Sequence, residues 1–101
     1  MAPDATAFVH RDAAFLLDTE TSWGGHDSAR VVADNLDWVE GFHHALDPYA
    51  TQQAYQNFID PALKDWKSAY YAQNLARLTR VKRAYDPDDV FRFPQSIPDA
   101  R

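Results

Sequence analysis

A short run between positions 55 and 60 combines side chains that suit binding or proton transfer. Tyr55, Asn57 and Phe58 stand close together, and Asp60 follows them. A phenol can take a proton when its pKa is lowered, and an amide both donates and accepts hydrogen bonds. Successive side chains of a regular strand point to opposite faces, so Asn57 and Phe58 share one site only if the backbone is irregular there. The alternative is a half-buried strand that precedes a helix.

Other polar groups have simpler explanations than metal binding. His43 and His44 are adjacent, so on a helix their side chains point about 100° apart, whereas helical zinc ligands stand at i and i+4. The acidic run Asp86, Asp88 and Asp89 lacks the loop length and the distal glutamate of an EF-hand. We therefore predict no metal site.

Two further groups carry charge without a clear catalytic pattern. His10-Arg11-Asp12 either lines a substrate pocket or forms a turn. A cluster of cations lies near the C-terminal end of a predicted helix. Cations at that end interact favourably with the helix dipole, whereas phosphate groups bind at helix N-termini, so we interpret the cluster as a stabiliser of the helix. The chain has no Gly-rich phosphate loop and no Gly-x-Ser-x-Gly elbow. A small stand-alone enzyme is therefore the weakest alternative. The cations are Arg77, Arg80, Lys82 and Arg83.

The elements that position these groups begin with extended chain. Apolar and polar residues alternate from Phe15 to Trp23, a period typical of a strand, so we predict strands within 7–25. A second extended piece is predicted over 53–59.

Two helices are predicted from their caps and apolar spacing. The first runs over 27–47, with Asp27 or Ser28 as N-cap and Pro48 disfavouring its continuation. The second runs over 61–85, because Asp60 followed by proline is typical of a helix start.

The predicted fold class is α+β, with short antiparallel strands and two main helices in one domain, 1–101. A tail over 86–101 contains a second cap-plus-proline start at Asp86. Two or three strands are too few for a stable sheet, and their edges would lie open. We therefore expect this segment to complete a larger sheet.

Composition excludes several classes of protein. The chain has 101 residues, of which 46% are hydrophobic and 14% aromatic, which argues against disorder. Its net charge of −5 argues against a nucleic-acid surface. It has no cysteine, no signal-peptide pattern and no apolar run that could span a bilayer, so we expect a cytoplasmic protein without nucleic-acid or membrane partners.

Several motifs occur in order over 55–98 and resemble one family. They are Tyr55-Gln-Asn57-Phe58-Ile-Asp60, Tyr70-Tyr71-Ala-Gln-Asn74-Leu-Ala-Arg77-Leu78, Val81-Lys82-Arg83-Ala-Tyr85-Asp86-Pro87 with Phe91, and Pro94-Gln95-Ser96-Ile97-Pro98. This pattern resembles the carboxyl-terminal berberine-like domain of FAD-linked oxidases of the berberine bridge enzyme type, within the vanillyl-alcohol oxidase superfamily.

The resemblance implies a flavoenzyme of which this chain is one part. FAD would be held by an FAD-binding domain of the same or a companion chain, and Asn57 and Tyr55 would lie against the cofactor. The family's catalytic tyrosine position holds Phe58, so no catalytic residue is predicted here. Ala72 replaces a usual glycine, and we expect it to favour the helix. Asn74 and Arg77 are expected to anchor the tail by hydrogen bonds.

The implied reaction is oxidation of an alcohol, an amine or a carbon–carbon unit, with hydride passing to the flavin and electrons then to oxygen. We expect the isolated chain to be inactive and to hold FAD weakly or not at all. The alternative is a non-enzymatic interaction module, whose open strand edges would pair with a partner or, as a homodimer, with a second copy.

Overall fold

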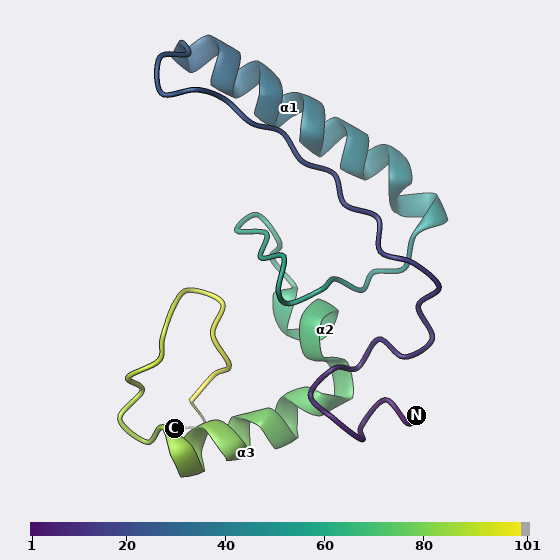
Figure 1. Cartoon of the computed structure of the whole chain (residues 1–101), viewed down its shortest axis with the longest axis vertical. Helices are drawn as coiled ribbons and strands as arrows, with labels where there is room; N and C mark the ends of the chain where they lie inside the picture. The colour runs from purple at the N-terminus through teal and green to yellow at the C-terminus, as the bar shows by residue number, and fades with distance from the viewer. Residues whose placement is uncertain (100–101) are drawn as a thin grey trace. The chain divides into compact units, whose positions relative to one another are not determined.

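Helices are the regular secondary structure of this protein in its computed structural model, which describes residues 1–99 (Figure 1). Helix α1 spans Ala29–Leu46 and is followed by a 3-10 turn, η1, at Asp47–Tyr49. Helix α2 spans Trp66–Tyr71, a 3-10 turn, η2, spans Ala72–Asn74, and α3 spans Leu75–Tyr85.

The predicted α+β class is wrong, because the described residues contain no strand. A strand needs a neighbour to accept and donate its backbone hydrogen bonds, and none of the described segments offers one. The alternating residues from Phe15 to Trp23 instead lie in irregular chain that runs alongside α1 in Figure 1, where Thr21 Oγ1 donates to Asn35 Oδ1 over 2.8 Å. The predicted extended piece over 53–59 also contains a turn.

The chain divides into two compact units. One unit joins Met1–Ala14 to the chain from Gln53 onward, and the other is Phe15–Gln52. The first unit therefore consists of two pieces that are distant in the sequence.

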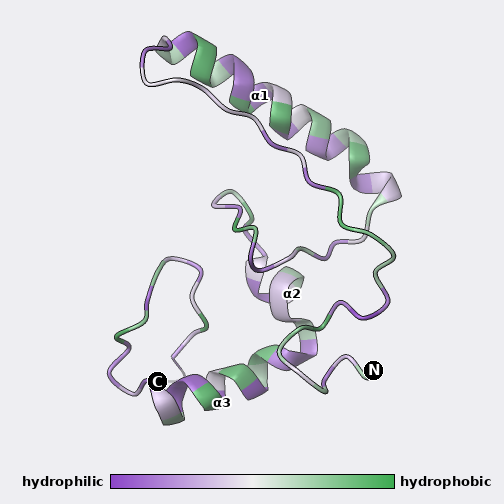
Figure 2. Ribbon diagram, in the orientation of Figure 1, coloured by the Kyte–Doolittle hydropathy of each residue, from purple (hydrophilic) through white to green (hydrophobic). Residues whose placement is uncertain are grey.

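Helix α1 in the second unit starts and ends where its caps dictate. Ser28 is the N-cap, and its hydroxyl accepts the backbone N–H of Val31 over 3.3 Å. Asp47 is the C-cap, immediately before Pro48. Apolar and polar residues alternate around the helix in Figure 2, yet none of its residues is buried. The packing face of α1 is thus largely uncovered in the described residues.

The core of the first unit is small and centres on α2. Its buried apolar residues are Val9, Ala69, Tyr70 and Tyr71, and Tyr70 has an exposed fraction of 0%. Paired tyrosines on the helix therefore form the core.

The long helix predicted over 61–85 is delayed and interrupted. Asp60 Oδ1 accepts the backbone N–H of Ala62 over 2.8 Å, which stabilises a turn, and α2 starts only at Trp66. Ala72 then has φ +43° and ψ −126°, which ends α2. This conformation is costly for any residue with a Cβ, so Ala72 does not favour a continuous helix here.

The interruption places Asn74 against the N-terminal segment. Asn74 is buried, and its Nδ2 donates to the carbonyls of Pro3 and Thr6 over 3.0 Å each. Arg77 reaches the carbonyl of Asp4 over 3.4 Å. The two residues are hydrogen-bond anchors, but they hold the start of the chain rather than the tail expected from the sequence.

Candidate functional site

The run around Asn57 forms a turn rather than a strand. The backbone N–H of Phe58 donates to the carbonyl of Tyr55 over 2.9 Å, and Asn57 Nδ2 donates to the Tyr55 hydroxyl over 2.8 Å. Asn57 is exposed, and Phe58 has an exposed fraction of 56%. The backbone therefore has the irregularity that a shared site for these two side chains requires.

Aromatic rings support this turn from the N-terminal piece of the unit. The ring of Tyr55 lies 5.6 Å from that of Phe58 and 5.7 Å, edge to face, from that of Phe8. Phe8 also contacts the His10 ring at 5.4 Å and the Arg11 guanidinium at 5.0 Å. Such ring pairs add about 0.5–1.5 kcal/mol beyond area burial, so they fix the orientation of Tyr55.

Three buried polar atoms beside this cluster have no hydrogen-bond partner in the described residues: His10 Nε2, Arg11 Nε and Gln56 Oε1. The other ring nitrogen of His10, Nδ1, lies 3.1 Å from Gln53 Oε1. Arg11 donates its backbone N–H to the carbonyl of Val9 over 2.9 Å, so the group is a tight bend. Buried polar atoms normally find partners, so this cluster has unused bonding capacity.

A buried hydrogen-bond network holds the turn to the core and to the tail. The Tyr70 hydroxyl accepts the backbone N–H of Asp60 and donates to Gln95 Oε1. Gln95 Nε2 donates to the carbonyls of Asp60 and Leu63 over 2.8 and 3.3 Å. Gln95 has no role among the sequence predictions, although it stands in the Pro94-Gln95-Ser96-Ile97-Pro98 motif.

Tyr71 is not suited to accept a proton near neutral pH. Burial raises the pKa of the Tyr71 phenol, and the neighbouring Tyr70 raises it further. A catalytic phenol needs a lowered pKa, so Tyr71 acts as a core residue.

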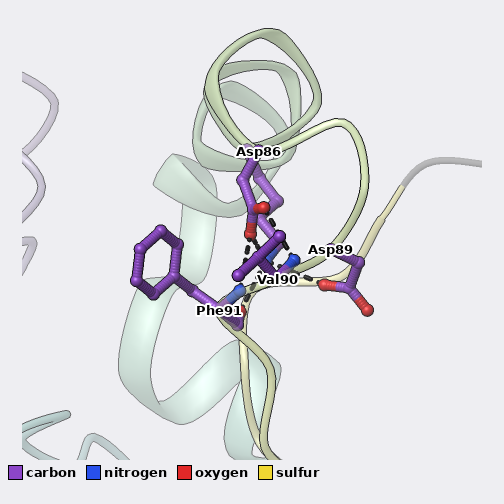
Figure 3. A network of polar contacts seen from close by, with 5 residues as sticks. Asp86, Asp89, Val90 and Phe91 are labelled. Carbon is purple, nitrogen blue, oxygen red and sulfur yellow. Dashed lines mark hydrogen bonds and ion pairs between the residues drawn. The ribbon is translucent and has the colours of Figure 1, made fainter.

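A charged cluster closes the turn after α3 (Figure 3). Lys82 Nζ pairs with the Asp86 carboxylate and lies 2.8 Å from Asp89 Oδ1. The hydrogen bond to Asp86, and then that to Asp89, raises the pKa of Lys82. The same bond to Lys82 lowers the pKa of Asp86. Asp86 thus stabilises a turn, as its cap position predicts, and Lys82 forms part of a structural ion pair.

A cavity of about 170 Å³ lies between α3 and the N-terminal segment. Ligand pockets typically measure about 300–1,000 Å³, so this cavity is too small for a flavin ring with its substrate. Its lining residues are Thr6, Ala7, Asn74, Arg77, Leu78 and Val81.

Among the described residues there is no group of three or more acidic, histidine or cysteine side chains that could hold a metal ion. Nor does any helix in that part of the chain combine the length and apolarity needed to cross a membrane.

Residues 54–98 match the family described as berberine and berberine like. This part of the chain belongs to that family. It contains the Asn57 turn, the Tyr70–Gln95 network and the Lys82 cluster. The family assignment expected from the motifs is therefore confirmed.

Curated relatives extend the similarity beyond the berberine-like residues. The chain is 42% identical over its whole length to the uncharacterized FAD-linked oxidoreductase YgaK of Bacillus subtilis, covering 22% of that protein. It is 38% identical over 97% of its length to YvdP of the same organism, covering 21% of it. It is 32% identical over 94% of its length to a chitooligosaccharide oxidase of Gibberella zeae, covering 20% of it. The chain thus spans about a fifth of these relatives. No solved structure gives a significant match.

Proposed function

We propose that this chain is the carboxyl-terminal segment of an FAD-dependent oxidoreductase and completes its substrate domain over the flavin ring. The proposal is supported by the similarity to FAD-linked oxidoreductases over the whole chain. It is also supported by the berberine-like residues 54–98, which include the exposed turn at Asn57.

The observation that carries the proposal is the Tyr55–Asn57 pair. Asn57 is exposed and Tyr55 is half-buried, while Phe8 packs against the Tyr55 ring and the Tyr70 network holds the end of the turn at Asp60. An amide nitrogen carries two hydrogens, and one of them is hydrogen-bonded to the Tyr55 hydroxyl. Asn57 therefore retains a second donor for a flavin carbonyl or a substrate oxygen. The orphaned polar atoms at His10, Arg11 and Gln56 add capacity on the same unit.

Bound FAD would supply the hydride acceptor, and the chain would supply positioning. Phe58 cannot take a proton, so it would form an apolar wall of the substrate pocket. The base of the complete enzyme then lies outside this turn, or the substrate needs none. The oxidised group would be an alcohol, an amine or a carbon–carbon unit.

The FAD-binding residues would lie in the remaining part of a longer or companion chain. The cavity beside α3 is too small for the cofactor, so we propose that the isolated chain is inactive and does not retain FAD. Fluorescence titration of the purified chain with FAD tests this, and a micromolar dissociation constant would overturn it.

A chimera tests the function directly. In this chimera the chain would take the place of the matching region of YgaK. The ratio of flavin absorbance to protein absorbance would be measured after gel filtration. We expect the chimera to retain FAD as YgaK itself does, and the Asn57→Ala variant to change the flavin absorption spectrum. The control is Gln73→Ala, an exposed amide on η2. A chimera that folds but has no flavin, when YgaK has it, would refute the proposal.

The alternative of an interaction module has lost its basis, because it relied on open strand edges that the described residues lack. A homodimer and a cytoplasmic location stay predictions, and light scattering of the purified chain tests the first of these.

A further inference from the structure

The turn that follows α3 holds the Lys82–Asp86 ion pair inside and two apolar side chains outside. The side chains of Lys82 and Asp86 have exposed fractions of 9% and 10%. Val90 and Phe91, by contrast, are 71% and 80% exposed. In Figure 3 the Phe91 ring points away from the carboxylates. This arrangement inverts the usual one, in which charges face water and apolar groups pack.

The polar contacts make this turn rigid. Asp86 Oδ1 accepts the backbone N–H of Val90 over 2.7 Å, and its Oδ2 accepts that of Phe91 over 3.0 Å. Lys82 Nζ donates to the carbonyl of Phe91 over 2.6 Å. The backbone on both sides of Phe91 is therefore fixed before any partner binds, which lowers the ordering cost of an interface.

We propose that Val90 and Phe91 form a preorganised anchor that inserts into an apolar pocket on the flavin-binding part of the longer protein. A rigid, exposed aromatic side chain is typical of residues that dominate an interface. Lys82, Asp86 and Asp89 already pair with one another, so the surface that complements Val90 and Phe91 is apolar rather than charged. This inference rests on the proposed function but concerns a surface other than the Asn57 turn.

The length of the relatives and the family match indicate that the partner of Val90 and Phe91 is the rest of a longer protein. The chain covers about a fifth of its curated relatives, so most of such a protein lies outside these residues. The anchor lies within the berberine-like residues 54–98, and it is therefore part of the segment shared with that family.

One substitution in two contexts tests the anchor. Phe91→Ala should leave the melting temperature of the isolated chain unchanged, because the ring has few contacts there. In the YgaK chimera the same substitution should lower the melting temperature by several degrees and reduce the yield of soluble flavoprotein. Asp88→Ala, at an exposed polar position of the same turn, is the control and should change neither.

Three outcomes would overturn the anchor. Phe91→Ala without effect on a folded chimera would show that the ring stays in solvent. A dimer of the isolated chain that Phe91→Ala converts to monomer would assign the surface to a second copy. If the unmodified chimera fails to fold, that result counts against the proposed function. The anchor is then tested in YgaK itself, by alanine at the position aligned with Phe91. An unchanged YgaK melting temperature would then refute it.

Discussion

Asp60 donates its backbone N–H to the Tyr70 hydroxyl over 3.0 Å, and that hydroxyl donates in turn to Gln95 Oε1 over 3.3 Å. One side-chain oxygen thus joins the turn before α2, the helix itself and the tail. The position of the Asn57 turn depends on this oxygen, because Asp60 ends the turn segment.

Tyr70→Phe should lower the free energy of unfolding of the chain by about 1–3 kcal/mol, because it removes the hydrogen-bond partner of the buried Gln95 Oε1 and of the Asp60 N–H. Urea denaturation followed by circular dichroism measures the change. Tyr85→Phe is the matched control, since Tyr85 is 86% exposed and should tolerate the loss of its hydroxyl. Equal stability of the two variants would contradict the role assigned to the network.

Ala72→Gly should stabilise the chain, because glycine adopts positive φ without a Cβ penalty. Ala72 has φ +43°, and residues in such conformations carry about 1–3 kcal/mol of strain. The gain is reduced by the larger entropy of glycine in the unfolded chain. Thermal unfolding should show a higher midpoint for Ala72→Gly and a lower one for Ala76→Gly, which lies inside α3. A lower midpoint for both would place Ala72 in an ordinary helix.

Asn74→Ala should release the N-terminal segment, because the Asn74 amide bonds the carbonyls of Pro3 and Thr6. Hydrogen exchange at Ala5 should become faster, and stability should fall by about 1–3 kcal/mol. Gln73→Ala removes an exposed amide one residue earlier and should change neither quantity. If exchange at Ala5 is the same in both variants, other contacts hold the segment.

The Lys82–Asp86 pair should make stability depend on pH at both extremes. The folded-state pKa of Asp86 is lowered, so its contribution is present above the unfolded pKa and is lost as pH falls through the folded pKa. The folded-state pKa of Lys82 is raised, so its contribution is present below the unfolded pKa and is lost as pH rises through the folded pKa. The full contribution therefore spans about pH 4 to about pH 10.

Lys82→Met should reduce stability within that window, and its difference from the unmodified chain should shrink outside it. Urea midpoints measured across pH give the comparison. Arg83→Met, at the exposed neighbouring cation, serves as control and should show no such profile. A difference between Lys82→Met and the unmodified chain that is constant with pH would assign Lys82 a packing role only.

Local signals predicted some elements correctly and others not. Ser28 caps the start of α1 and Pro48 follows its end, and both could be predicted because caps act within one turn of the helix. The alternation from Phe15 to Trp23 failed, since a strand depends on a neighbour that the described residues do not supply.

In the candidate site, too, the sequence predicts local features better than features that depend on distant contacts. The irregular backbone at Asn57 was stated from the sequence as a condition for a shared site, and the structure has a turn there. The break at Ala72 was missed, because helix propensity carries no information on the contacts of Asn74 with residues about seventy positions away. Gln95 was missed for the same reason.

The contact of 3.1 Å between His10 and Gln53 has a consequence for how this segment can evolve. The chain leaves the first unit after Ala14 and re-enters it at Gln53, so everything between them is an excursion whose two ends are joined. Doubling the length of such a loop costs only about 0.6 kcal/mol in closure entropy. The first unit should therefore tolerate insertions, deletions or even replacement of Phe15–Gln52. Descendants of one ancestor can diverge there while the Asn57 turn stays in place.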